Sequence, residues 1–149
     1  MSIINGMAHV ALSVSKFEES KKFYKSLLPF LGLKLVFDGK DSFYHVGSRT
    51  ALMIQKCNKK HDNDKFIQGT VGLHHLCFRA RSKEAVDSIA KKLSEMKAYI
   101  DRGPIEGPWV NGYYYIVFED PNGIRLEVNF VPGSGVLDSK NTFNPSEYS

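Results

Sequence analysis

Two absences limit what this chain can be. Cysteine occurs only twice in 149 residues, at Cys57 and Cys77, so the chain lacks the cysteine framework of a small disulfide-stapled domain. No apolar stretch approaches the roughly 18–20 residues that a membrane-spanning helix needs. The first residues include neither a basic segment nor an apolar signal core. We therefore expect a reduced, cytoplasmic protein with no membrane partner.

Charge of one sign is also scarce. The formal net charge is +4, and the basic residues are scattered except for Lys56, Lys59 and Lys60. A nucleic-acid-binding protein would show a basic stripe or a recognisable module, so we expect a small-molecule substrate and no nucleic-acid partner. Apolar residues make up 42% of the chain, which is enough for a core, and the length suits one domain over residues 1–149.

A repeat in the order of elements runs through the sequence. Each half opens with an alternating strand headed by a histidine, His9 or His75. Each strand leads into an amphipathic helix, over residues 15–31 and about 81–96, with apolar residues at a spacing near 3.6. Such a repeat predicts two copies of one structural unit.

Capping residues and turn residues bound the other elements. Ser15 with Glu18 predicts a capping box for the first helix, and Ser82 predicts the N-cap of the second. Asp120-Pro-Asn-Gly123 predicts a tight turn, and residues 103–108 predict a loop at the mouth of a cavity. Three strands should follow each helix, at about residues 34–37, 43–46 and 51–56 in the first half and 99–100, 113–118 and 124–130 in the second.

These elements predict an α+β fold, in which two tandem β-α-β-β-β units form a curved mixed sheet with the helices on its outer face. The first unit should cover about residues 7–57 and the second about 71–131, joined by a polar linker over 58–70. From 132 to 149 the chain is rich in Gly, Ser and Asn, which predicts a flexible arm or one that docks on a partner.

Alternation along the strands predicts which residues face a cavity. In the two opening strands and the last strand, one face is apolar and should meet the helices. The opposite face carries His9, His75 and Glu127. A sheet with helices on one side leaves its other face to solvent or to a ligand. Because two neutral imidazoles and a carboxylate suit Fe(II), Mn(II), Ni(II) or Zn(II), these residues predict a divalent metal site.

The first unit should supply a fourth group at the place equivalent to Glu127. Alternation turns Met53 and Gln55 inward. The amide oxygen of Gln55 is a doubtful ligand, whereas the thioether of Met53 does not serve a hard metal. His74 is the rival of His75, but the same alternation turns it toward the helices or an edge.

Other inward residues leave two interpretations open. Glu127 could pair with Arg79 or Arg125 instead of a metal, since an unpaired buried carboxylate is costly. Both arginines could equally bind an anionic group of a substrate. Trp109, Tyr113 and Tyr115 lie before or within the strand that should face Glu127, and they either pack or line a substrate pocket. The sequence predicts these five residues as substrate contacts: Arg79, Trp109, Tyr113, Tyr115 and Arg125.

Four segments carry a resemblance to a known family. They are His9-Val-Ala-Leu-Ser-Val, Phe23-Tyr-Lys-Ser-Leu-Leu, Gly72-Leu-His-His75-Leu-Cys-Phe and Phe118-Glu-Asp-Pro-Asn-Gly-Ile-Arg-Leu-Glu127-Val. Over about residues 7–131 the chain resembles the vicinal oxygen chelate superfamily, which groups glyoxalase I, extradiol dioxygenases, fosfomycin-resistance proteins and bleomycin-binding proteins. Within it, the chain is similar to small single-module glyoxalase-like members.

The resemblance implies that His9, His75 and Glu127 occupy the family's metal positions, with Glu127 also catalytic. It implies a metal-dependent lyase, isomerase or dioxygenase whose substrate chelates the ion through two adjacent oxygens, and a homodimer. The chain departs from metal-bound glyoxalase I, which usually has a carboxylate in the first unit where this chain offers Met53 or Gln55. The alternative is a metal-free binding protein of the bleomycin-resistance kind, which would sequester a ligand in an aromatic cleft.

Overall fold

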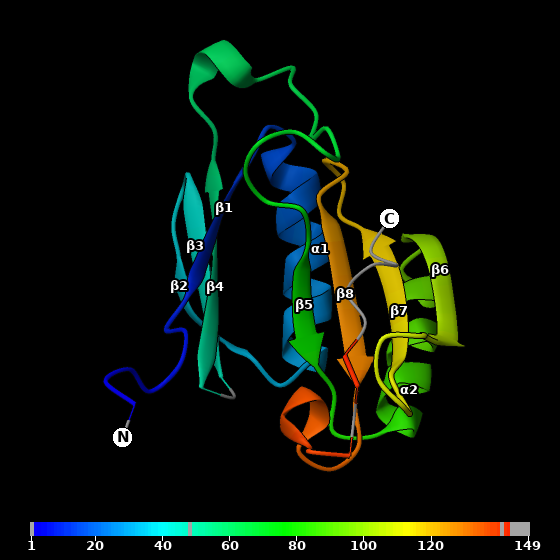
Figure 1. Cartoon of the computed structure of the whole chain (residues 1–149). Coiled ribbons are helices and arrows are strands. Elements are labelled where there is room, and N and C mark those ends of the chain that lie inside the picture. The colour runs from blue at the N-terminus through cyan, green and yellow to red at the C-terminus, as the bar shows by residue number, and fades with distance from the viewer. Residues whose placement is uncertain (1, 48, 141, 144–149) are drawn as a thin grey trace. The chain divides into compact units, whose positions relative to one another are not determined.

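The computed structural model describes residues 2–47, 49–140 and 142–143, arranged in two compact units (Figure 1). Unit 1 holds residues 1–66 together with 121–123, and unit 2 holds residues 67–120 together with 124–149. Each unit contains one α-helix and a four-stranded mixed sheet. The predicted α+β class and the tandem β-α-β-β-β arrangement are therefore confirmed.

In unit 1 the helix α1, Phe17–Phe30, covers one face of the sheet. The strand order is β1-β4-β3-β2, with β1 parallel to β4 and the other neighbours antiparallel. The ring of Phe17 lies 5.8 Å from that of Phe43 on β3, so the apolar stripe of α1 meets the sheet. The strands are β1 Val10–Val14, β2 Lys34–Asp38, β3 Ser42–Gly47 and β4 Thr50–Lys56.

The start of α1 depends on a side chain from the turn between the last two strands. Lys16 is the N-cap, and its side chain makes no capping bond, so the predicted Ser15–Glu18 capping box is wrong. Instead, Oδ1 of Asn122 accepts hydrogen bonds from the backbone N–H groups of Ser15 at 2.9 Å and Lys16 at 3.0 Å. Nδ2 of Asn122 donates to the hydroxyl of Ser20 at 2.7 Å. A residue 107 positions away in sequence therefore fixes the two residues that lead into this helix.

Unit 2 repeats the same plan with the strand order β5-β8-β7-β6. The helix α2, Lys83–Glu95, begins as predicted, because the backbone N–H of Ala85 donates to the hydroxyl of Ser82 at 3.2 Å. Its buried residues Val86, Ile89 and Leu93 face the sheet core. The strands are β5 Leu76–Arg79, β6 Tyr99–Glu106, β7 Tyr114–Glu119 and β8 Arg125–Phe130.

Strand β6 is longer than the sequence predicts. It continues to Glu106, so the loop predicted over 103–108 is wrong for its first four residues. The register of β6 against β7 shifts on both sides of Arg102, and such bulges let a strand pass through glycine and proline. Gly103 has φ +88°, and a Cβ at this position would collide with the backbone carbonyl oxygen of Tyr115.

The connections agree with the sequence in part. The predicted turn at Asp120 is present, and the N–H of Ile124 donates to Oδ1 of Asp120 at 2.8 Å. The polar linker contains a short 3₁₀ helix, Lys59–His61, and the arm contains another, Gly135–Leu137. Residues 141 and 144–149 of the predicted arm lie outside the described residues. No helix within the described ranges has the length and apolar character needed to cross a membrane.

Candidate functional site

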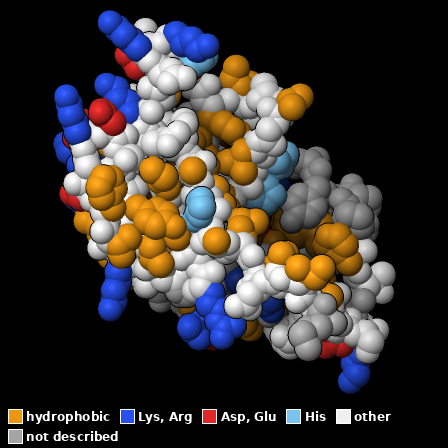
Figure 2. Space-filling view, turned by 90° about the vertical axis from the view of Figure 1, so that its left-hand side faces the viewer, with side chains coloured by type: hydrophobic (Ala, Val, Ile, Leu, Met, Phe, Trp, Pro, Cys, Tyr) orange, Lys and Arg blue, Asp and Glu red, His pale blue; other side chains and the backbone are white. Residues whose placement is uncertain are grey.

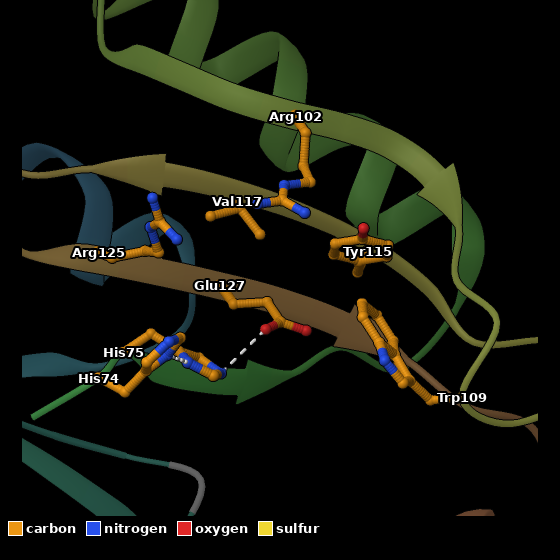
Figure 3. A pocket seen from close by; sticks show the side chains of 8 residues that line it. All are labelled: His74, His75, Arg102, Trp109, Tyr115, Val117, Arg125 and Glu127. Carbon is orange, nitrogen blue, oxygen red and sulfur yellow. Dashed lines mark hydrogen bonds and ion pairs between the residues drawn. The ribbon is translucent and has the colours of Figure 1, made fainter. Parts of the chain in front are cut away.

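The centre of the site is the pair His75 and Glu127 in unit 2. His75 directly precedes β5, and the parallel register of β5 and β8 places Cys77 beside Glu127. Nε2 of His75 lies 3.2 Å from Oε2 of Glu127 (Figure 3). Two donors bound at about 2.1 Å to one ion lie about 3–3.5 Å apart. The pair therefore fits two neighbouring positions on a metal ion, and it also fits a hydrogen bond or ion pair without one.

A hydrogen bond from Tyr113, supported by Asn129, holds the carboxylate of Glu127 in place. The hydroxyl of Tyr113 donates to Oε1 of Glu127 at 2.5 Å, and Nδ2 of Asn129 donates to the oxygen of Tyr113 at 2.7 Å. Burial, followed by the hydrogen bond to Glu127, raises the pKa of the Tyr113 phenol above its usual range. The phenol therefore keeps its proton and remains a donor. The two oxygens of Glu127 thus have different neighbours, Tyr113 at Oε1 and His75 at Oε2.

His74 also belongs to this site, and the prediction that it turns away is wrong. Its Nδ1 lies 2.7 Å from Nδ1 of His75, and both rings line the same pocket. The alternation rule failed because β5 begins only at Leu76, so His74 and His75 precede the strand. If Nδ1 of His75 is the donor in this contact, Nε2 carries the lone pair that a metal requires.

A small pocket opens beside the pair. Its volume is about 30 Å³, which is room for about two water-sized groups. It is lined by His74, His75, Arg102, Trp109, Tyr115, Val117, Arg125 and Glu127 (Figure 3). All eight residues belong to unit 2.

Three of the predicted substrate contacts line the pocket and two do not. Trp109, Tyr115 and Arg125 are pocket residues. Tyr113 lies behind Glu127, although its ring centroid is 5.0 Å from that of Trp109 and 5.6 Å from that of Tyr115. Arg79 donates to the backbone carbonyl oxygen of Val131 at 3.4 Å and does not line the pocket. A substrate contact by Arg79 or Tyr113 stays a prediction.

Sequence reasoning missed Arg102. The strand of this residue was expected to end at Ile100, so no face was assigned to it. In the structure Arg102 pairs with Val117, and Val117 pairs with Glu127. The only available signal was the cationic side chain itself, because the bulges that carry β6 past Ile100 depend on pairing with β7.

Cys77 stands next to Glu127 but is not prepared as a nucleophile. The residue is exposed, although protein atoms, including those of Glu127, surround its sulfur. Loss of water contact, followed by the charge of Glu127, raises the pKa of the thiol above its usual range. The reactive thiolate form is therefore disfavoured.

The strand register identifies the counterpart of Glu127 in unit 1. Cys77, two residues after His75, pairs with Glu127; Ala11, two residues after His9, pairs with Met53. Met53 is therefore the equivalent residue. Gln55 lies one step further along β4, where its Nε2 donates to the hydroxyl of Ser13 at 3.2 Å. Ligation by Gln55 stays a prediction that the repeat does not support.

His9 is the counterpart of His75 in unit 1, since each histidine directly precedes the opening strand of its unit. The ring of His9 makes an edge contact with Tyr44, at 6.2 Å between centroids. Within either unit, among the residues that the structure describes, no three His, Cys, Asp or Glu side chains come together as a ligand set. The joint site of His9, His75 and Glu127 stays a prediction.

Comparison with known proteins identifies the family. A family profile described as the Glyoxalase/Bleomycin resistance protein/Dioxygenase superfamily matches residues 6–128. Because this match covers most of the chain, the protein belongs to that superfamily. This confirms the resemblance seen in the sequence.

Individual relatives extend the match. The chain is 32% identical to the uncharacterized Bacillus subtilis protein YqjT over 125 residues, which cover 82% of this chain and 96% of that protein. It is similar to the crystal structure of a Bacillus halodurans protein classed by name with the glyoxalases, with a TM-score of 0.76, 30% identity, and coverage of 85% and 96%. Lactoylglutathione lyase from Agrobacterium tumefaciens shares the fold, with a TM-score of 0.64, 20% identity, and coverage of 87% and 96%.

Proposed function

We propose that this protein is a metal-dependent enzyme acting on a small substrate with two adjacent oxygen atoms. The observation that carries the proposal is the 3.2 Å separation of His75 Nε2 and Glu127 Oε2, which suits two ligands of one ion. In this proposal His9, His75 and Glu127 hold a divalent ion of Fe, Mn, Ni or Zn. When bound, such an ion supplies Lewis-acid stabilisation of negative charge on a chelating substrate, in lyase, isomerase or dioxygenase chemistry.

In this proposal, residues of the chain transfer the proton, exclude water and bind the substrate. Glu127 is the proposed acid–base group: Tyr113 anchors its Oε1, and its Oε2 faces the pocket side, where it accepts or returns a substrate proton. Trp109 and Tyr115 form an apolar wall that excludes water from this proton transfer, and their ring centroids are 5.1 Å apart. Arg125 offers a positive charge to the substrate from the same pocket.

A second candidate is a metal-free binding protein, and one observation favours it. The contact between His75 and Glu127 also suits a hydrogen-bonded ion pair, and three aromatic rings, Trp109, Tyr113 and Tyr115, gather beside it. Such a cleft could hold a ligand by stacking and hydrogen bonding without chemistry.

Metal content separates the two candidates. Protein purified without chelators should contain about one transition metal ion per chain, or take one up on dialysis against Zn(II) or Mn(II), as measured by elemental analysis. His75→Ala and Glu127→Gln should lose the ion. His61→Ala, which removes an exposed histidine paired with Asp64, should keep it. Wild-type protein that neither holds nor takes up metal would reject the enzyme proposal in favour of the binding protein.

We also propose that the protein works in the cytoplasm as a homodimer. The row of side chains in unit 1 that corresponds to the catalytic row of unit 2 is apolar: Ala11, Met53, Tyr44 and Phe37 pair across the sheet. Phe37 is 54% exposed, and Figure 2 shows hydrophobic side chains gathered on the side of the molecule where β2 and β3 lie. An apolar face of this kind is typical of an interaction surface. Light scattering of the purified protein should give twice the chain mass of 16.8 kDa.

A further inference from the structure

Two guanidinium groups enter the pocket from strands on either side of β7. Arg102 comes from β6 and Arg125 from β8, and both line the pocket. Figure 3 shows their head groups on opposite sides of Val117. Their positive charges therefore act on the same small space.

Arg125 has no partner within the described part of the chain. Its Nε is buried and makes no hydrogen bond there, and no ion pair involving Arg125 is formed. Glu119 is its neighbour in the β7–β8 register, yet the two do not pair. Withdrawing a cation from water without a counter-charge is costly. Arg125 is only half-buried, but its buried, unpaired Nε and its positive charge offer a place for an anion in the pocket.

Two acids near these arginines, Glu127 and Asp101, already have partners. Both oxygens of Glu127 have partners, Tyr113 at Oε1 and His75 at Oε2. Asp101 fixes the guanidinium of Arg102, because Nε of Arg102 donates to Oδ2 of Asp101 at 3.0 Å. This contact uses one of the five N–H donors of the guanidinium. The guanidinium also interacts with the side chain of Tyr115, another pocket residue, and its remaining donors are left to meet a ligand.

The size and lining of the pocket narrow the choice of anion. A volume of about 30 Å³ holds about two water-sized groups, which matches the two oxygens of a carboxylate. Trp109, Tyr115 and Val117 make the rest of the wall apolar. We propose that the pocket binds the carboxylate of a small organic acid between Arg102 and Arg125, while the apolar body of the acid extends beyond this volume. That such an acid is the substrate of the enzyme rests on the proposed function. That the pocket binds a carboxylate does not depend on the proposed function.

The single tryptophan of the chain provides a direct readout, because Trp109 lines this pocket. Trp fluorescence should be titrated with benzoate, with its neutral analogue benzamide, and with inorganic phosphate. The protein should be stripped of metal with EDTA and then freed of EDTA by gel filtration, since EDTA is itself a carboxylate. Benzoate should give a saturable change and bind at least tenfold more tightly than benzamide or phosphate.

Variants assign the binding to the two arginines. Arg102→Gln and Arg125→Gln should each weaken benzoate binding about tenfold or more, as expected for a lost charge-assisted hydrogen bond. Arg125→Lys, which keeps the charge but not the planar fork, should weaken it less. Arg81→Gln, at an exposed arginine that does not line the pocket, should bind like wild type. Thermal melting of each variant shows that it is folded.

Several results would overturn the proposal. They are equal binding of benzoate and benzamide, tighter binding of phosphate, and unchanged benzoate affinity in both folded glutamine variants. Metal uptake, measured on the same preparations, keeps the two proposals separate. Metal binding without benzoate binding would leave the proposed enzyme standing and remove the carboxylate site. Benzoate binding by a protein that takes up no metal would leave the carboxylate site standing and reject the proposed enzyme.

Discussion

Met53 in unit 1 and Glu127 in unit 2 occupy the same position of the repeated sheet. Each pairs with the residue two places after the histidine that opens its unit, Ala11 in one case and Cys77 in the other. The two halves share their backbone plan, but unit 2 carries a carboxylate where unit 1 carries a thioether. The potential metal ligands are therefore unequally divided between them.

This equivalence predicts the effect of restoring the acid. Met53→Glu should raise the affinity for Zn(II) about tenfold or more, because a fourth, anionic donor would join the proposed site. Gln55→Glu is the matched control, since Gln55 lies one step further along the same face and bonds to Ser13. Competition with a chromophoric chelator measures both. A gain in Gln55→Glu alone would show that the register argument selects the wrong residue.

Tyr113→Phe tests the anchoring of Glu127. Loss of the hydroxyl leaves Oε1 of Glu127 and Nδ2 of Asn129 without this partner, so we expect a loss of about 1–3 kcal/mol in the free energy of unfolding. Metal affinity should fall about tenfold as the carboxylate loses its orientation. Urea denaturation and metal competition provide the measurements.

The neighbouring residue supplies the control for this change. The hydroxyl of Tyr114 donates to an exposed carboxylate of Asp87 at 2.7 Å. Tyr114→Phe should therefore cost less than about 1 kcal/mol and leave metal affinity unchanged. Equal losses in the two variants would contradict a special role for Tyr113.

His74→Ala tests whether one histidine orients the other. The contact of 2.7 Å between the Nδ1 atoms of His74 and His75 resembles the hydrogen bond that usually fixes the free nitrogen of a ligating imidazole. Its removal should lower Zn(II) affinity about 10–100-fold, with His61→Ala again as the control. Wild-type affinity in His74→Ala would mean that the contact does not prepare His75 for a metal.

We predict that His45 lowers the free energy of unfolding of the protein in acid. It lies fully buried on β3, and neither ring nitrogen has a hydrogen-bond partner among the described residues. Removal from water, helped by Lys25 and opposed by Asp38, lowers the pKa of the imidazole below its usual 6.5. The unfolded chain then takes up a proton near pH 6.5 that the folded chain accepts only at lower pH. The contribution of His45 to stability is therefore constant above about pH 7 and becomes unfavourable as the pH falls below about 6.5.

Replacement of His45 by leucine should remove this acid sensitivity. At pH 7.5 His45→Leu should also raise the free energy of unfolding by about 1 kcal/mol, because two unpaired buried nitrogens disappear. Urea denaturation at pH 5 and pH 7.5 compares the variant with wild type. An identical loss between these pH values in both proteins would exclude His45 as its source.

Much of the fold followed from alternation and element order. The alternating burial along β1 was predicted correctly, and so were the Ser82 cap and the turn at Asp120. The wrong predictions concern residues whose structure depends on contacts with distant parts of the chain or on where a strand begins. Ser15 had the neighbours of a capping box, but Asn122, from another part of the chain, accepts the hydrogen bond from the N–H of Ser15 that Glu18 was expected to bind. The side of His74 was predicted with an alternation rule that applies only inside a strand, and His74 precedes β5.

The sequence by itself determined the α+β repeat and the side of the sheet on which Glu127 should lie, because hydrophobic periodicity and strand alternation are properties of neighbouring residues. Only the tertiary structure decided that Met53 is the counterpart of Glu127, that Tyr113 anchors this carboxylate, and that Arg102 enters the pocket. These relationships arise from strand register and bulges. Hydrogen bonds between segments far apart in the chain set both, and no local pattern encodes them.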